Sequence, residues 1–302
     1  MPAPPTVAII ILNWNNPRDT LACLDSVSHL TYQPMRVIVV DNGSTDGSAS
    51  TIASCYPQVE IVRSKENLGY AGGNNLGMRA ALSQGCDYFW LLNDDILAAP
   101  ESLSLLVSAA QAQPAAGMLG PMVYIRGEQN RILSAGGLIE KEGIPSQRGM
   151  GELDDGRYNG VTEVDYVSGC ALLISRYAVD RIGMLDEDFF AYHEEIEWCY
   201  RARQTGMKVL FVPKALAWHP DTRLRDYDSP VVTYYITRNS LLFARKHHLG
   251  KALIARMFFG SALTLVRWSV QPRWWHKVRQ RRAMARGLAD FMLGRYGRAE
   301  AL

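Results

Sequence analysis

The first 95 residues alternate between short apolar runs and segments whose apolar residues recur at helical spacing. The apolar runs cover residues 7–12, 37–40, 59–62 and 88–92. The first run, VAIIIL, is continuous and rich in β-branched residues, which is typical of a strand buried on both faces of a parallel sheet. Residues 18–30 and 71–82 lie between the runs and carry apolar residues three or four positions apart, as helices do. This alternation predicts an α/β layered domain.

The pattern changes after residue 113. Over residues 114–166 glycine and proline become frequent and the apolar runs shorten, which predicts loops and short strands in a substrate-facing insertion. Beyond Pro230 the chain is expected to be mostly helical. The elements expected between these stretches are a strand at 167–174, helices at 176–182 and 194–204, and a strand at 209–212 that Pro213 ends.

Composition narrows the class of protein. The chain has 302 residues, of which 48% are hydrophobic and 21% charged, and this excludes a disordered, collagen-like or coiled-coil protein. Its five cysteines include no Cys-x-x-Cys pair, which argues against a zinc ribbon or a disulfide scaffold and favours a reducing compartment. We expect neither a signal peptide nor a standard membrane span, because no run of about 18 uncharged apolar residues occurs.

Charge divides the chain into two parts. Residues 1–244 contain 19 Lys and Arg but 28 Asp and Glu, whereas residues 245–302 contain 13 Lys and Arg and only two acids. An acidic body followed by a basic tail predicts two parts with different tasks.

Polar residues gather where the predicted strands end. The segments that follow the four strands are Asn13-Trp14-Asn15, residues 41–46, residues 67–75 and Asn93-Asp94-Asp95. Open α/β sheets bind ligands beyond the carboxyl ends of their strands, so these segments predict a ligand site at one edge of the sheet. The glycine-rich residues 69–77 lack both the Gly-x-Gly-x-x-Gly pattern and a Walker lysine, which leaves the two commonest phosphate-loop types unsupported.

Each of these residues has a structural and a functional interpretation. Asp94 and Asp95 are adjacent carboxylates that a hard divalent cation would neutralise, although an aspartate near a helix start is also a common N-cap. Asp41 could accept a hydrogen bond from a base or a ribose, or could form an Asx-turn. Trp14 could stack on a nucleobase or lie in the core. Four polar strand ends together favour the functional interpretation.

A second acidic cluster opens the predicted helix at 194–204. Glu194, Glu195 and Glu197 occupy its first turn, where the helix dipole by itself favours acids. The aromatic residues just before them would raise the pKa of a carboxylate and suit it to general-base catalysis. His219 follows a predicted strand and is either structural or an additional metal ligand.

Several segments of the chain, taken in their order along the sequence, resemble the bacterial family-2 glycosyltransferases of the GT-A fold, particularly their rhamnosyltransferase-like branch. The matching segments are VAIIILNWN, VIVVDNGSTDGS, NLGYAGGNNLG, FWLLNDDI, VSGCALLISR, DEDFFAYHEEIEWCYRARQTG, AWHPDTR and YYITRN. The resemblance implies a Rossmann-like mixed sheet with flanking helices, a nucleotide-diphosphate-sugar donor, Mg²⁺ or Mn²⁺, and an inverting single displacement. We accordingly expect a nucleotide-binding half (1–113), an acceptor-binding and catalytic half (114–244) and a basic helical extension (245–302).

The resemblance also implies individual roles. Glu195 takes the place of the aspartate in the family's Glu-Asp pair and would be the general base, with Glu194 as the competing candidate. Asp95 would bind the metal that bridges the diphosphate, and His219 would lie beside it as a further ligand. The remaining roles would be donor binding by Trp14, Asn15, Asp41, Asn67, Gly69, Asn75 and Asp94, and contacts to the diphosphate or the acceptor by Arg201 and Arg238.

The basic extension mixes Trp268, Trp274 and Trp275 with arginines and lysines. This mixture suits an interface with anionic lipid, whereas the apolar residues 257–266 are too few to span a bilayer. A helical layer packed on the sheet with a solvated basic face is the alternative. No nucleic-acid motif accompanies the arginines, so we expect no nucleic-acid partner. The sequence leaves the oligomeric state open.

The leading hypothesis is a cytoplasmic, inverting, metal-dependent glycosyltransferase, peripheral on the inner face of the cell membrane. It would transfer a sugar from a dTDP- or UDP-sugar to a lipid-linked or polysaccharide acceptor in cell-surface glycan synthesis. The family branch that the chain resembles favours rhamnose as this sugar. A sugar nucleotidyltransferase would require a basic glycine-rich loop near the start of the sequence, which this chain lacks. A catalytically inactive glycan- or membrane-binding subunit would not need its acidic clusters.

Overall fold

The computed structural model describes residues 3–140, 144–221 and 228–300. Its strands are β1 (Val7–Asn13), β2 (Met35–Asp41), β3 (Glu60–Arg63), β4 (Tyr88–Asn93), β5 (Leu97–Ala98), β6 (Ala116–Ile125), β7 (Ile132–Ser134), β8 (Gly137–Ile139), β9 (Pro145–Gln147), β10 (Thr162–Glu163), β11 (Ala171–Ser175) and β12 (Lys208–His219). Its helices are α1 (Pro17–Ser28), α2 (Ser48–Cys55), α3 (Gly69–Ser83), α4 (Ser102–Ala112), α5 (Arg176–Ile182), α6 (Glu194–Gln204), α8 (Pro230–Lys246), α9 (Lys251–Val270) and α10 (Val278–Leu293), with a 3₁₀ helix η1 (Pro272–Lys277).

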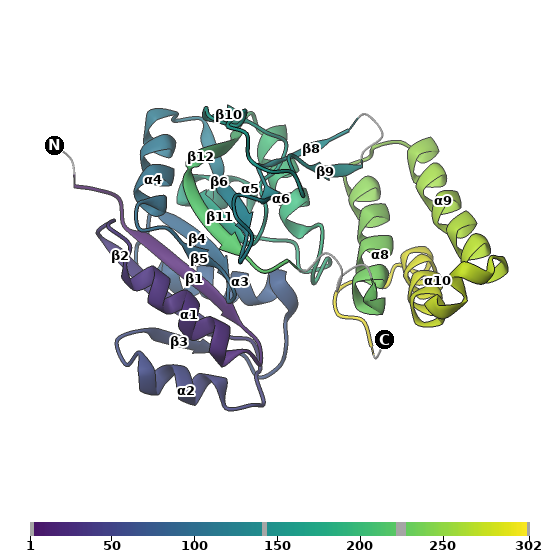
Figure 1. The fold of residues 1–302 in the computed structure, drawn as a ribbon, viewed down its shortest axis with the longest axis horizontal. Helices are drawn as coiled ribbons and strands as arrows, with labels where there is room; N and C mark the ends of the chain where they lie inside the picture. The colour runs from purple at the N-terminus through teal and green to yellow at the C-terminus, as the bar shows by residue number, and fades with distance from the viewer. Residues whose placement is uncertain (1–2, 141–143, 222–227, 301–302) are drawn as a thin grey trace.

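One mixed sheet forms the body of the molecule (Figure 1). Its main order is β10-β12-β6-β11-β4-β1-β2-β3, with β5 paired to β12 and β7 paired to β6. The strands β4, β1, β2 and β3 are parallel, and β11 runs antiparallel between β4 and β6. The parallel half corresponds to the alternating strands and helices that the sequence predicts, so the mixed α/β sheet is confirmed.

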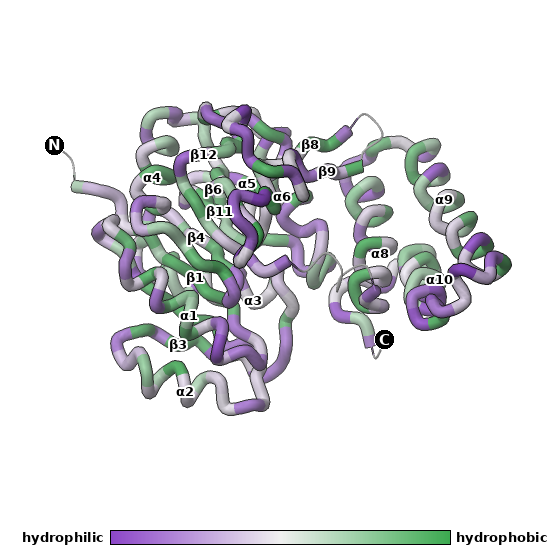
Figure 2. Tube along the Cα trace, in the orientation of Figure 1, coloured by the Kyte–Doolittle hydropathy of each residue, from purple (hydrophilic) through white to green (hydrophobic). Residues whose placement is uncertain are grey.

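The core lies on both faces of this sheet. Along β1, Ile9 and Ile11 point to one face and pack in the same cluster as Leu24 of α1, while Ala8 and Ile10 point to the other face. These strand residues are 0% exposed, and apolar residues are prominent along the central strands in Figure 2. Alternating side chains of a strand face opposite sides, so a fully apolar strand requires cover on both. Helices supply that cover and produce three layers.

Two strands of the second half correct the sequence expectations. Residues 114–166 contain more than loops and short strands, because β6 is a ten-residue, almost entirely buried strand inside the sheet. Strand β12 does not end at Pro213 but continues to His219, with an irregular register between Val212 and Leu216. A proline is tolerated where the hydrogen-bond ladder is already interrupted. This continuation carries His219 to the edge of the sheet that receives the other strand ends.

Helices α8, α9 and α10 pack together beside the sheet (Figure 1). Tyr234 of α8 donates a hydrogen bond to Asp290 of α10 (Oη to Oδ2, 2.8 Å). Helix α9 contrasts with both, because none of its residues is buried. Among the described residues it is the one helix that is long and apolar enough to cross a membrane. Its 20 residues extend beyond the apolar stretch 257–266 on both sides and include Arg256 and Arg267.

Candidate active site

Three parallel strands deliver polar residues to one edge of the sheet. Asn13 is in register with Asp41 across β1 and β2, and Leu12 is in register with Asn93 across β1 and β4. Asn13 and Asp41 are buried, at 0% and 6% exposure. The amide Nδ2 of Asn13 donates to Ser44 Oγ (3.1 Å) and lies 3.5 Å from Asp41 Oδ1. Strand register therefore brings these separate polar segments together.

Hydrogen bonds connect the loop after β1 to the loop after β2 and leave Trp14 exposed. The backbone nitrogen of Asn15 donates to Ser44 Oγ (3.0 Å), and Asn15 Oδ1 accepts from the backbone nitrogen of Thr45 (2.8 Å). Asn15 is thus engaged in holding its own loop. The side chain of Trp14 between these contacts is 53% exposed, so it offers a flat aromatic surface beside the polar strand ends.

A network of asparagines shapes the loop into α3. Asn42 Nδ2 donates to Asn67 Oδ1 (3.2 Å) and to the carbonyl oxygen of Gly69 (3.0 Å), and Asn67 Oδ1 accepts from the Gly69 amide (2.8 Å). Gly69 has a φ of 73°, and a Cβ there would lie 2.3 Å from the carbonyl oxygen of Phe190. Only glycine fits this close approach. The loop is therefore held tightly against the segment that precedes α6.

Asp94 and Asp95 lie in contrasting electrostatic surroundings after β4. Burial, and then the charge of Asp95, raise the pKa of Asp94 to about 7. Burial would raise the pKa of Asp95 too, but its close contact with the imidazole of His219 outweighs burial and holds that pKa below its usual value. His219 Nε2 lies 3.1 Å from Asp95 Oδ1. Asp95 is therefore the carboxylate that stays charged at neutral pH.

The chemistry of this pair fits a divalent cation. His219 Nδ1 lies 2.7 Å from the carbonyl oxygen of Pro220, which can only accept, so Nδ1 carries a proton and Nε2 is the nitrogen that faces Asp95. A cation held by Asp95 would bind the lone pair of Nε2 in place of a proton on that nitrogen. Asp95 Oδ1 is buried, and no contact within the described ranges gives it a hydrogen bond of acceptable geometry. The described residues hold no cluster of three or more His, Cys, Asp or Glu that would complete a site. Waters and ligand oxygens would have to supply the remaining positions, as they commonly do for Mg²⁺.

Helix α6 begins with two glutamates whose protonation differs. Glu194 is 4% exposed, and its Oε2 has no hydrogen-bond partner in the part of the chain that the structure describes. Burial, and then the charge of Glu195, raise the pKa of Glu194 well above its usual range and so favour its protonated form. Burial raises the pKa of Glu195 only to about 6 because nearby backbone hydrogen bonds oppose it. Glu195 is therefore mostly ionised at pH 7.

Cys170 and Tyr70 join the strand-end cluster to α6. The carbonyl oxygen of Cys170 accepts from the Asn93 amide (3.0 Å). The pKa of its thiol is raised to about 12, mainly by burial and further by the charges of both Asp95 and Glu195. Tyr70 donates to the carbonyl oxygen of Gly169, next to Cys170, and burial, followed by the charges of Glu194 and Glu195, raises its pKa. A Cβ on Gly169 would lie 3.3 Å from the Cβ of Glu195, so residues 169–170 lie beside Glu195 and beside the end of β4. The sequence analysis did not single out either residue, although both lie inside matching segments, NLGYAGGNNLG and VSGCALLISR.

Three residues that the sequence predicts in the site form their hydrogen bonds and ion pairs elsewhere in the protein. Asn75 donates to the carbonyl oxygen of Leu185 and to Glu187 Oε1 (both 2.9 Å), so it ties α3 to the segment before α6. Arg201 pairs with the buried Glu197 on its own helix (2.9 Å) and donates to backbone carbonyls. Arg238 is 1% exposed and donates to carbonyls and neighbouring side chains. These contacts are internal to the protein and bring none of the three to the strand-end cluster.

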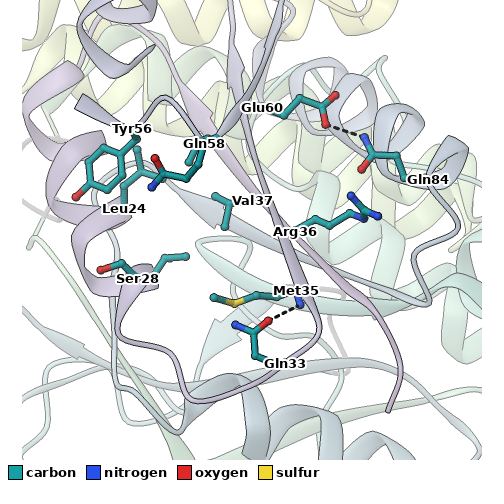
Figure 3. A pocket seen from close by; sticks show the side chains of 12 residues that line it. Leu24, Ser28, Gln33, Met35, Arg36, Val37, Tyr56, Gln58, Glu60 and Gln84 are labelled. Atoms are coloured by element: carbon teal, nitrogen blue, oxygen red, sulfur yellow. Dashed lines mark hydrogen bonds between the residues drawn. The ribbon is translucent and has the colours of Figure 1, made fainter. Parts of the chain in front are cut away.

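A separate pocket of about 380 Å³ lies at the other end of the parallel strands (Figure 3). Leu24, Met35, Arg36, Tyr56 and Glu60 contribute to its lining. Strand β2 begins at Met35, whereas the polar end of that strand is Asp41, roughly 20 Å away at the rise of a β-strand. This pocket is therefore distinct from the candidate active site.

The fold and the site together define a glycosyltransferase. The family model "Glycosyl transferase family 2" matches residues 8–183, more than half of the sequence, and the chain belongs to this family. The match covers β1 to α5 and therefore includes both Asp95 and Cys170.

The most similar relatives include two rhamnosyltransferases. An N-acetylglucosaminyl-diphospho-decaprenol L-rhamnosyltransferase of Mycobacterium tuberculosis is 29% identical over 75% of this chain and 80% of its own. A dTDP-rhamnosyl transferase, RfbF, of Shigella flexneri is 26% identical over 82% of each chain. Among solved structures, a mannosyltransferase of Pyrobaculum calidifontis in complex with GDP-Man and Mn²⁺ superposes with a TM-score of 0.57 at 14% identity, covering 97% of this chain and 88% of its own. That likeness supports the GT-A fold of this chain.

Proposed function

We propose that this protein is an inverting, divalent-metal-dependent rhamnosyltransferase that uses a dTDP-sugar donor and a lipid-linked acceptor. The observation that carries the proposal is the position of residues 169–170: a Cβ on Gly169 would lie 3.3 Å from the Cβ of Glu195, and Cys170 accepts a hydrogen bond from Asn93, two positions before Asp95. The carboxylate of Asp95, beside the His219 imidazole, suits metal binding at the leaving diphosphate. The carboxylate of Glu195 suits the removal of a proton from the acceptor hydroxyl. The choice of sugar and acceptor rests on the two rhamnosyltransferase relatives.

In the proposed reaction Glu195 acts as the general base. Its carboxylate accepts the proton of an acceptor hydroxyl while the hydroxyl oxygen bonds to the anomeric carbon from the face opposite the nucleotide. The bond from that carbon to the diphosphate oxygen breaks, and the diphosphate leaves with the electron pair. Asp95 and His219 would hold Mg²⁺ or Mn²⁺, which would stabilise the negative charge on the leaving diphosphate. Trp14 would stack on the base, with Asp41 and Asp94 accepting hydrogen bonds from the nucleoside.

A thermal-shift experiment tests the donor site. We expect dTDP with Mn²⁺ to raise the melting temperature of the purified protein, because a ligand at a hundredfold excess over its Kd stabilises the native state by about 2.7 kcal/mol. Neither dTDP nor Mn²⁺ alone should give this shift, and UDP or GDP with Mn²⁺ should give a smaller one. Transfer from dTDP-rhamnose to an N-acetylglucosaminyl-diphospho-prenol would then establish sugar and acceptor. A folded protein that responds to no nucleotide would favour a binding subunit instead.

We also propose that α9 lies on the anionic inner face of the cell membrane. Its outward side presents Phe259, Leu263, Val266 and Val270, which are between 49% and 68% exposed and follow one another at helical spacing. Its other side faces η1 and α10, where Arg281 donates to the carbonyl oxygen of Trp268 (2.9 Å). An amphipathic helix that keeps protein contacts on one side suits an interfacial position better than a membrane-spanning one.

Negative charge introduced on this face should remove lipid binding. We expect the double variant Phe259→Glu/Leu263→Glu to bind vesicles containing anionic lipid about 100-fold more weakly, because burying each apolar side chain contributes about 1.5–3 kcal/mol. Vesicle co-sedimentation measures the loss. Tyr177→Glu is the matched control, since Tyr177 is 60% exposed on the distant helix α5. Equal binding by the double variant and the wild type would contradict the proposal.

A further inference from the structure

The segment that leads into the proposed base adopts an unusual backbone conformation. Phe190, Tyr192 and His193 have φ values of 63°, 68° and 77°. Left-handed conformations are costly for bulky residues and persist only where surrounding contacts hold them in place. His193 is the N-cap of α6, two positions before Glu195, so the strained backbone determines where this glutamate points. We call residues 186–193 the base loop.

Asn239 of α8 makes three of these holding contacts. It is 0% exposed, and its Nδ2 donates to the carbonyl oxygens of Phe189 (2.9 Å), Ala191 (2.8 Å) and Tyr192 (2.7 Å). An amide nitrogen is suited to this position because it carries two hydrogens and no lone pair that would repel the carbonyls. One side chain therefore gathers three carbonyl oxygens of the base loop.

Arg238, the preceding residue, extends the same contact. Its Nη2 donates to the carbonyl oxygens of Asp188 and Phe189 (both 3.1 Å), and its Nε donates to Asn239 Oδ1 (2.9 Å). The Arg238 contact fixes the orientation of the Asn239 amide, so that Nδ2 rather than Oδ1 faces the base loop. Its Nη1 donates to the carbonyl oxygen of Gly297 (2.7 Å), and the amide of Gly297 donates back to the carbonyl oxygen of Asp188 (2.7 Å).

Lys246 at the end of α8 contacts the beginning of the base loop, and the next residue, His247, contacts α6. Lys246 lies between the carboxylates of Asp186 and Asp188, with its Nζ 2.7 Å from Asp188 Oδ2. His247, the residue after α8, places its Nε2 3.1 Å from Glu197 Oε1 on α6. Helix α8 thus contacts the beginning of the base loop, its strained centre and the helix that carries Glu195.

We propose that Arg238 and Asn239 are positioning residues that hold the base loop so that Glu195 faces the acceptor hydroxyl. This inference rests on the proposed role of Glu195. Neither side chain reaches the polar strand ends where the nucleotide would bind. Their loss should therefore lower turnover without weakening donor binding.

The test is the variant Asn239→Asp, which keeps the shape of the side chain but replaces the donor with a carboxylate that repels the three carbonyls. We expect kcat for transfer from dTDP-rhamnose to fall about 100-fold, the effect of displacing a reacting group by about 1 Å. The KM for dTDP-rhamnose should stay unchanged. Hydrogen exchange should accelerate in peptides covering residues 186–196 and stay unchanged in β1 and β4. Asn239→Ser, which is shorter and retains one donor, serves if the aspartate variant does not fold.

Ser240→Ala is the matched control, because Ser240 is the next residue and, among the described residues, its hydroxyl donates to a carbonyl of its own helix (3.3 Å) and to no other group. It should leave both kcat and exchange unchanged. Unchanged exchange in residues 186–196 of the Asn239 variants would overturn the proposal, as would faster exchange with unchanged kcat, or a raised KM with unchanged kcat. If the wild type transfers no rhamnose, the proposed function fails, and exchange alone then decides whether Asn239 holds the base loop.

Discussion

Glu195→Gln is expected to lower kcat by about 10²–10⁴-fold, the contribution of a positioned general base, while nucleotide binding stays at the wild-type level. The amide has nearly the same shape as the carboxylate but cannot accept the acceptor proton. Glu194→Gln is the matched control. Since burial already favours the protonated form of Glu194, its neutral replacement should have a much smaller effect. Rates are to be measured with saturating donor, and binding by the metal-dependent thermal shift.

The pH profile gives this prediction a second measurement. Burial raises the pKa of Glu195 to about 6. Below that pH the carboxylate gains a proton and cannot act as a base, so kcat should fall tenfold per pH unit on the acid side and level off above about pH 7. The Glu194→Gln variant should keep this acid limb, and Glu195→Gln should lose it. A Glu195→Gln enzyme that stays active while Glu194→Gln is inactive would move the base to Glu194.

Asp95→Asn is expected to lower kcat by about 10²–10³-fold, the usual cost of removing one group that stabilises charge in the transition state. It should also abolish the metal-dependent part of the dTDP thermal shift. The reason is local: Asp95 is the ionised carboxylate of the pair, it faces His219 Nε2 at 3.1 Å, and its Oδ1 is buried without a hydrogen bond among the described residues.

Asp25→Asn is the control for Asp95→Asn, because Asp25 is an exposed residue of α1 and the substitution removes the same charge. It should leave the thermal shift and kcat unchanged. A metal-dependent shift of wild-type size in Asp95→Asn would contradict the proposed metal site. A shift that is lost equally in Asp25→Asn would point to net charge rather than coordination.

The parallel half of the fold could be predicted from the sequence because its strands are apolar on both faces, as β1 shows. Strand β6 could not be predicted, since Gly117, Gly120 and Pro121 within it suggest turns. The structure shows a different reason for Gly120: a Cβ there would lie 2.5 Å from the Cβ of Val167. This glycine serves close packing between neighbouring segments, and a packing partner nearly fifty positions away leaves no local signal.

The composition of the site could be predicted in the same way, but the direction of its side chains could not. The polar strand ends meet as expected because parallel register forces them together. Asn75 and Arg238 lie in equally suggestive segments yet turn toward carbonyl oxygens of the base loop and the residues just before it. The packing of α3 and α8 around that segment determines how these two side chains are oriented. A single sequence carries no signal for that packing.

The contact between Gly297 and the base loop has a consequence for the order in which the protein matures. Residues 7–219 contain every strand of the sheet and are synthesised first, so the sheet can fold while the ribosome is still adding later residues. Asp188 and Arg238 each gain one further backbone partner only when Gly297 has been made. The sheet can therefore be complete in a nascent chain before the last of these contacts to the base loop forms.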